Sequence, residues 1–265
     1  MGRHMAAAKG TYVYAVVAAD KRPRLTGVPA GLPGTGKVRL LDADPSLYVV
    51  VTDAPLDRYG ETAINRGLGD LEWVSRAAVA HEAVVEAFIG AKAVLPMKLF
   101  TIFMNDERAL AHVRGDRERI AAVVRRVGNH QEWGVRVVFD RARAVAARRR
   151  PVKAGALRPA ASGIAYLAQK KAQRDATAEL ASNARQTVAA LFDKLSSRAR
   201  DARRRPASEM PADGGPLLLD AAFLVPRARA TSFQSLMARE AKSLERQGYG
   251  LTLSGPWPPY TFVKD

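Results

Sequence analysis

The stretch with the most recognisable chemistry is a near-complete phosphate-binding loop, GLPGTGKV, at residues 31–38. The motif G-x-x-x-x-G-K-[ST] holds phosphates with backbone N–H groups and a lysine, and holds magnesium with a hydroxyl. Gly31, Gly36 and Lys37 fit this motif, but Val38 stands at the hydroxyl position and cannot bind a metal. The next residues, RLLDADP, have a strand pattern, so no helix N-terminus would face a phosphate. We therefore interpret residues 31–38 as a flexible glycine-rich turn between two strands.

Other residue types that carry out chemistry are scattered along the chain. His81 lies on the apolar side of a predicted helix, where its i+3 and i+4 neighbours are Val84 and Val85, so a packed, hydrogen-bonded histidine is favoured over a metal ligand. No serine lies in a G-x-S-x-G motif, and the chain contains no cysteine. Carboxylates are dispersed over predicted helix surfaces. The sequence therefore predicts no catalytic residue, no cofactor, no metal and no small-molecule substrate.

The elements of the first part of the chain predict an α+β domain over residues 10–128. Runs of β-branched and aromatic residues predict strands at 11–19, 37–43, 47–54 and 93–103. An apolar helical period extends from Asp70 to Gly90. A second period extends from Asn105, a good N-cap, to Gly128, with a break at Gly115. We interpret residues 1–9 as a disordered cloning remnant.

The remainder, residues 129–265, has a β-α-β-α-β pattern. Strands are predicted at 132–140, 217–226 and from 249, and helices at 162–200 and 232–247. The long helix has an apolar side formed by Ile164, Leu167, Ala184, Val188, Leu191 and Leu195. Basic connections flank this helix, the second one being RRRPASEMPADGGP. Two helices on one face of an antiparallel sheet indicate a ferredoxin-like fold, one strand short.

The chain is strongly basic, with a formal net charge of +16. Such a charge is compatible with nucleic acid, an anionic membrane or an acidic protein partner. The arginines lie along predicted helices and linkers, which is typical of solvated faces, and no apolar run approaches the ~18 residues that cross a bilayer. An RNA-binding alternative remains open for the second domain, because Trp133 and Phe139 share one side of a strand, although the glycines of the RNA-recognition motif are absent.

The most unusual stretch is the closing GPWPPYTF, residues 255–262. Its prolines fix an extended backbone, and Trp257 and Tyr260 add large apolar rings with polar tips. We expect residues 255–265 to fold back onto the sheet as a clasp. The alternative is an exposed docking peptide.

Several segments together resemble the gas vesicle protein GvpL/GvpF family, over nearly the whole chain from Thr11. The closing SGPWPPYTF is similar to the family pattern T-G-P-W-P-P-Y-x-F, and the W…A-V…H…V-V pattern recurs in LEWVSRAAVAHEAVVE. VLPMKLFTIF is similar to V-L-P-L-R-F-G-T-V-F, with Lys98, Leu99 and Phe100 replacing R-F-G. EWGVRV and SGIAYLAQKK also fit. The matching positions, which we expect to be structural, are Trp73, His81, Pro96, Thr101, Trp133, Tyr166, Gly255, Pro256, Trp257, Pro258, Pro259, Tyr260 and Phe262.

The resemblance implies a non-enzymatic protein with two α+β domains, the second a modified ferredoxin-like fold. It implies a role in building gas vesicles, at the gas vesicle within the cytoplasm, through binding of the small shell protein and other accessory proteins. The basic residues Arg148, Arg149 and Arg150 are candidates for contact with acidic patches on such partners. A basic nucleic-acid-binding module is the alternative function.

Overall fold

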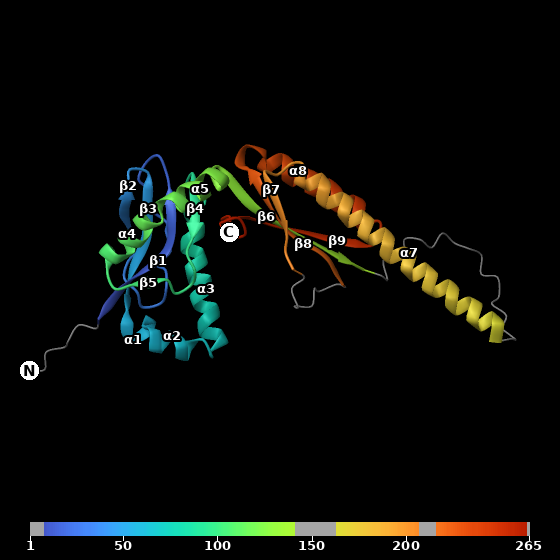
Figure 1. The fold of residues 1–265 in the computed structure, drawn as a ribbon, viewed down its shortest axis with the longest axis horizontal. Coiled ribbons are helices and arrows are strands. Elements are labelled where there is room, and N and C mark those ends of the chain that lie inside the picture. The colour runs from blue at the N-terminus through green and yellow to red at the C-terminus, as the bar shows by residue number, and fades with distance from the viewer. Residues whose placement is uncertain (1–7, 141–162, 207–215, 264–265) are drawn as a thin grey trace, which may run out of the picture. The chain divides into compact units, whose positions relative to one another are not determined.

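A computed structural model describes residues 8–140, 163–206 and 216–263, except for some side chains near the start of the long helix (Figure 1). The chain divides into two compact units: unit 1 comprises residues 1–132 with 256–265, and unit 2 comprises residues 133–255. The expected boundary after residue 128 therefore lies a few residues too early, and the last ten residues, expected in the second domain, group with the first unit instead.

Unit 1 is built on an antiparallel sheet with the order β2-β3-β1-β4, in which β5 also pairs with β1. Its strands are β1 (Lys9–Ala18), β2 (Arg39–Asp44), β3 (Leu47–Pro55), β4 (Ala93–Pro96) and β5 (Ile102–Phe103). The central strand β1 is buried on both faces, and none of the residues 12–17 is more than 2% exposed. Residues 1–9 were expected to be disordered, and this is wrong for the last two of them. Lys9 begins β1, and the Ala8 carbonyl accepts a hydrogen bond from Leu56 N.

Five helices of unit 1 lie among the described residues: α1 (Leu56–Tyr59), α2 (Glu61–Gly67), α3 (Leu71–Glu86), α4 (Asp106–Gly115) and α5 (Arg117–Val127). Asn105 caps α4 through its side-chain oxygen, as predicted. Asp70, where the first helical period was predicted to begin, caps α3 in the same way. The sequence did not predict α1 and α2, which are too short to show an apolar period. The apolar side of α3 begins later than expected, because Leu71 is 83% exposed and the buried positions start at Ala77.

The single strand expected at 93–103 is wrong. Two separate strands, β4 and β5, pair with the same edge of β1: Pro96 lies opposite Ala15, and Ile102 lies opposite Tyr12. The intervening residues 97–101 leave the sheet. The turn depends on Phe100, whose φ of 65° lies in the left-handed region.

Unit 2 has the element order β6 (His130–Phe139), α7 (Gly163–Ser196), β7 (Asp201–Arg204), β8 (Leu217–Pro226), α8 (Ala230–Glu245) and β9 (Tyr249–Trp257), with a short 3-10 turn before α8. Its sheet has the order β7-β8-β6-β9. The edge strand β7 was not predicted: it begins directly after the predicted helix 162–200 and overlaps the start of the segment interpreted as a flexible basic connection. Arginine-rich edge strands give no alternating apolar signal, and here Arg204 is held over the Phe192 ring at 4.4 Å.

Both helices of unit 2 pack on one face of its sheet. The shared core contains Val188 and Leu191 from α7, Phe233 and Met237 from α8, and Phe223 from β8. The predicted apolar side of α7 is confirmed at Ala184, Val188, Leu191 and Leu195, which are all buried. It does not extend to the start of the helix, where Leu167 is 64% exposed.

Candidate partner-binding cleft

The phosphate-like loop at residues 31–38 has a structural explanation. Arg39 begins β2 directly after it, so no helix follows, as predicted. Gly31 has a φ of 83°, and a Cβ there would collide with the hydroxyl of Tyr14, which accepts a hydrogen bond from Leu32 N at 3.0 Å. Gly36 N donates to the Asp53 carbonyl at 2.8 Å. The expected turn between two strands is confirmed, and these bonds and the buried Leu32 fasten it to the sheet.

His81 occupies a buried position against β1. Its Nδ1 lies 2.7 Å from the hydroxyl of Tyr12, which also accepts a hydrogen bond from Phe100 N at 3.3 Å. Burial lowers the pKa of His81 to about 4, although a hydrogen bond with the Met97 backbone acts in the opposite direction. The neutral imidazole therefore joins three segments of unit 1: β1, α3 and the 97–101 turn.

Trp73 and Phe100 form a second anchor for the same turn. Their rings stack at 5.0 Å between centroids, and Trp73 also stacks with Tyr59 at 6.2 Å. Phe100 stands where the family pattern has glycine, and its left-handed backbone explains why glycine suits this position. In this chain the aromatic stack offsets the strain of a bulky residue with positive φ.

The closing segment belongs to unit 1 and is held by a buried carboxylate. Glu132 is 3% exposed and accepts hydrogen bonds from Thr261 N at 2.7 Å and Thr261 Oγ1 at 2.6 Å. Phe262 is fully buried, and Pro258 and Pro259 are buried as well. Gly255, at the start of the motif, has a φ of 112°, which an L-residue rarely adopts.

These elements surround an open cleft of about 950 Å³ in unit 1. Four of the motif residues named from the sequence line it: His81, Pro96, Thr101 and Tyr260. The remaining lining residues are Ala78, Glu82, Met97, Lys98, Leu99, Phe103, His112, Arg119 and Val263. The lining is thus a mixture of apolar side chains with a few charged groups, which is the usual character of a recognition surface.

Tyr260 gives the cleft a polar group of its own. Its hydroxyl is buried and has no hydrogen-bond partner among the residues that the structure describes. Burial raises the pKa of Tyr260, and the carboxylates of Glu82, Glu86 and Glu132 raise it further. The hydroxyl therefore stays protonated at neutral pH.

The other predicted positions do not reach the cleft. Trp133 is 2% exposed and packs near Phe233 in the core of unit 2, whereas Trp257 is 38% exposed. Tyr166 lies in α7, but its side chain falls outside the described residues, as do Arg148, Arg149 and Arg150.

Because Trp133 is buried and Phe139 packs against the same core, neither ring can stack on a base, and the RNA-binding alternative loses its aromatic support.

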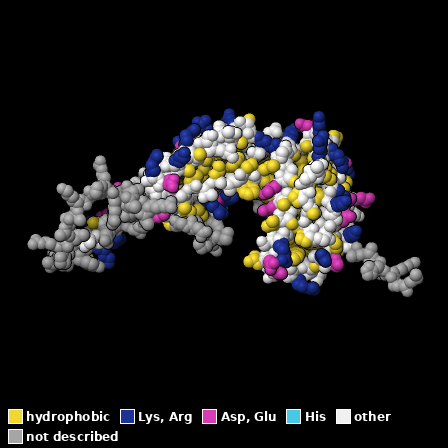
Figure 2. Space-filling view, turned by 180° about the vertical axis from the view of Figure 1, so that it is seen from behind, with side chains coloured by type: hydrophobic (Ala, Val, Ile, Leu, Met, Phe, Trp, Pro, Cys, Tyr) yellow, Lys and Arg dark blue, Asp and Glu magenta, His cyan; other side chains and the backbone are white. Residues whose placement is uncertain are grey.

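Charge is spread over the surface. Figure 2 shows Lys and Arg side chains distributed over the visible face of both units and mixed with apolar side chains, without a continuous basic stripe. Within the described part of the chain, no group of three or more His, Asp or Glu could hold a metal ion. The same residues include no helix that is long and apolar enough to cross a bilayer.

Sequence reasoning missed Tyr12, Glu132 and Thr261, which hold the motifs in place. Each contacts a residue that is distant in the chain: Tyr12 binds His81, and Glu132 binds Thr261 across 129 positions. Only the position of Glu132 in an otherwise apolar strand pattern gave a signal, because a carboxylate there must be paired or exposed.

The structure is thus an α+β fold in which the motif residues hold distant segments together around the unit 1 cleft. The sequence profile of the family described as "Gas vesicle synthesis protein GvpL/GvpF" matches residues 10–264, and the chain therefore belongs to this family. A gas vesicle-related role follows, in a family of gas vesicle structural and assembly proteins rather than a known family of enzymes.

Individual relatives agree with this assignment. "Gas vesicle protein L" of Streptomyces sp. (strain CB03234) is 29% identical over 256 residues, which cover 95% of this chain and 92% of the relative. The crystal structure of the gas vesicle protein GvpF from Anabaena sp. PCC7120 has a TM-score of 0.66 at 16% identity and covers 97% of each chain. GvpF from Microcystis aeruginosa has a TM-score of 0.62 at 16% identity, covering 97% of this chain and 99% of the other. At this identity the two structures show a shared fold.

Proposed function

We propose that this chain acts in gas vesicle assembly, at the gas vesicle within the cytoplasm, by binding the small shell protein and other accessory proteins without catalysing a reaction. Unit 2 serves as a modified ferredoxin-like scaffold. Its β-α-β-β-α-β element order and the strand order β7-β8-β6-β9 support that description.

The observation that carries the proposal is the convergence of family-motif residues on the unit 1 cleft. His81, Pro96, Thr101 and Tyr260 come from three distant stretches of sequence and line one surface. Most of these residues also have packing or hydrogen-bonding roles, so the motif maintains the shape of the cleft.

The chemistry of the lining suits an apolar partner segment. Met97, Leu99, Phe103 and Val263 offer apolar contact. A protein that lines a gas phase is strongly apolar before it assembles, and such a surface aggregates unless a partner covers it. The cleft therefore covers an apolar segment of the shell protein until that segment enters the shell.

A binding experiment tests this proposal with two matched variants. Leu99→Glu places a charge in the cleft, whereas Met104→Glu places the same charge at a side chain that is 74% exposed and does not line it. We expect Leu99→Glu to weaken co-purification with the shell protein by at least about tenfold, because it buries a carboxylate at the contact. Met104→Glu should retain binding, and equal thermal melting of the two variants excludes misfolding.

Two outcomes would count against the proposal. Equal retention of the shell protein by both variants would remove the cleft as its binding surface. If the unmodified chain does not associate with the shell protein, the shell protein is not its partner. Charge reversal of Arg148, Arg149 and Arg150 tests the separate expectation that basic residues attract acidic patches, and undiminished binding at low salt would contradict it.

A further inference from the structure

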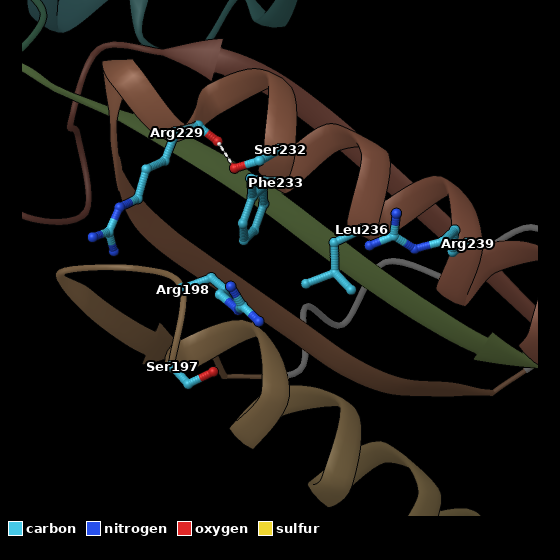
Figure 3. Close-up of a pocket in the computed structure, with 7 residues that line it drawn as sticks. All are labelled: Ser197, Arg198, Arg229, Ser232, Phe233, Leu236 and Arg239. Atoms are coloured by element: carbon cyan, nitrogen blue, oxygen red, sulfur yellow. Dashed lines mark hydrogen bonds between the residues drawn. The ribbon is translucent and has the colours of Figure 1, made fainter.

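A second hollow lies within unit 2, between the end of α7 and the start of α8 (Figure 3). It encloses about 550 Å³. Three arginines line it, Arg198, Arg229 and Arg239, together with Phe233, Leu236 and two serines. We call this hollow the arginine groove.

The polar lining of the groove consists essentially of guanidinium groups. In Figure 3 the side chain of Arg198 extends from the end of α7 toward α8, which carries Ser232, Leu236 and Arg239. The two serine hydroxyls are already engaged, since Ser232 Oγ donates to the Arg229 carbonyl at 2.9 Å and Ser197 Oγ donates to the Lys194 carbonyl at 2.8 Å. The arginine side chains therefore provide the groove's available hydrogen-bond donors.

Two described carboxylates of unit 2, Glu240 and Asp220, bind other cations. Glu240 pairs with Lys194 at 2.5 Å, and Asp220 pairs with Arg136 at 3.1 Å and with Arg205 at 2.7 Å. No carboxylate among the described residues forms an ion pair with Arg198, Arg229 or Arg239, and all three arginines are exposed. The groove thus presents concentrated positive charge to solvent.

The position of this charge is unfavourable for the fold itself. Arg229 is the N-cap residue of α8, its side chain makes no capping bond, and the first turn of α8 contains no acidic residue. The N-terminus of a helix carries positive partial charge, so acidic side chains stabilise it and basic ones do not. An external anionic group would relieve this arrangement.

The floor of the groove is apolar. Phe233 is 1% exposed and Leu236 is 8% exposed, and both belong to the core of unit 2. Arginines around an apolar floor match the composition of protein interfaces, in which arginine and aromatic residues are enriched. A single-stranded nucleic acid would instead require exposed rings for base stacking, and the groove offers none.

We propose that the arginine groove binds an acidic amphipathic segment of a partner protein. Carboxylates of the segment form charge-assisted, bidentate bonds with Arg198, Arg229 and Arg239, and an apolar side chain between them packs over the exposed edge of Leu236. This site is separate from the unit 1 cleft, and its partner does not depend on the shell-protein proposal.

The test uses the full chain and a fluorescein-labelled synthetic helical peptide with Glu and Leu on one face. Its partner peptide carries Gln at every Glu position. Fluorescence anisotropy should show binding of the Glu peptide at least about tenfold tighter than binding of the Gln peptide, because carboxylates replace neutral amides at the guanidinium groups.

Two double variants separate the groove from general surface charge. Arg198→Glu with Arg239→Glu reverses two charges in the groove, and Arg174→Glu with Arg246→Glu reverses two exposed charges elsewhere in unit 2. The groove variant should weaken binding of the Glu peptide by at least about tenfold and the control by less than about threefold. Arg198→Lys with Arg239→Lys keeps the charge and should have an intermediate effect, because lysine lacks the bidentate fork.

Several outcomes would overturn the proposal. Equal losses in the two charge-reversal variants would mean non-specific attraction. Equal binding of the Glu and Gln peptides would mean that carboxylates are not recognised. Displacement of the peptide by single-stranded RNA in the unmodified chain, with RNA binding lost only in the groove variant, would assign the groove to phosphates instead. Circular dichroism of each variant checks that the fold is retained. The lysine variant keeps the net charge, so its loss of binding reports on the bidentate geometry alone.

Discussion

Unit 1 and unit 2 are stabilised in different ways. Among the described residues, unit 1 buries Thr11, Thr52, His81 and Glu132, whereas unit 2 buries one polar residue, Asp220. Most of the polar groups in unit 1 join segments that are far apart in the chain, for example His81 with Tyr12 and Glu132 with Thr261. The core of unit 2 consists of apolar side chains from three strands and two helices.

This difference explains where the recognisable motifs fall. A buried hydrogen bond requires particular atoms at particular positions, because an unsatisfied buried polar group is costly. An apolar core tolerates exchange of side chains when volume and pattern are kept. Ten of the thirteen motif residues belong to unit 1, among them the hydrogen-bonded His81, and three, Trp133, Tyr166 and Gly255, belong to unit 2.

The largest expected effect concerns the pH dependence of unit 1. Because the pKa of His81 is about 4 in the folded chain and 6.5 in the reference state, the unfolded chain binds a proton between these values and the folded chain does not. The contribution of His81 to the free energy of unfolding is therefore constant above pH 6.5 and falls by about 3 kcal/mol toward pH 4. Urea unfolding between pH 7 and pH 4.5 measures this loss.

Variants assign the loss to this residue. His81→Gln should flatten the pH dependence relative to the unmodified chain, and His112→Gln, at an exposed position, should leave it in place. Unit 2 contains no histidine, so a probe within it should report no matching loss. If His81→Gln has the same slope as the unmodified chain, the buried neutral imidazole is not the cause.

A smaller effect is expected at the closing segment. Glu132→Gln removes the charge that strengthens the two bonds to Thr261 and should lower the free energy of unfolding by about 2 kcal/mol. Amide hydrogen exchange should accelerate most at residues 260–263 of unit 1. Glu118→Gln, at an exposed glutamate of α5, should change stability by less than about 0.5 kcal/mol. Unchanged exchange at Thr261 in the first variant would contradict the role of Glu132.

The smallest effect concerns the strained turn. Phe100 has a φ of 65°, so Phe100→Gly relieves backbone strain while losing the stack on Trp73, whereas Phe100→Ala loses the stack and keeps the strain. Thermal unfolding should therefore rank the glycine variant above the alanine variant by about 1 kcal/mol. At the exposed position 111 in α4 the order should reverse, with Ala111→Gly less stable by about 0.5–1 kcal/mol. The same order at both positions would exclude left-handed strain at Phe100.

The sequence by itself determined most elements of the fold. Several periodic and capped segments were predicted correctly, including the α4 cap at Asn105 and the buried positions of α7 from Ala184 onward. These features depend on local backbone propensity and on the spacing of apolar residues, which the sequence contains directly. The family was also identifiable from the sequence of its closing motif, in which proline and glycine residues fix the backbone geometry.

Tertiary structure alone decided the break between β4 and β5, the edge strand β7, the grouping of residues 256–265 with unit 1, and the two surfaces at which partners are proposed to bind. Each depends on contacts between residues distant in the chain, such as Glu132 with Thr261, or on a backbone angle that only packing makes tolerable, as at Phe100. Pattern reasoning detects local periodicity and has no access to such long-range pairing. The local sequence was sufficient to reject the glycine loop as a nucleotide site. Its hydrogen bond to Tyr14, which is distant in the chain, could not be predicted in the same way.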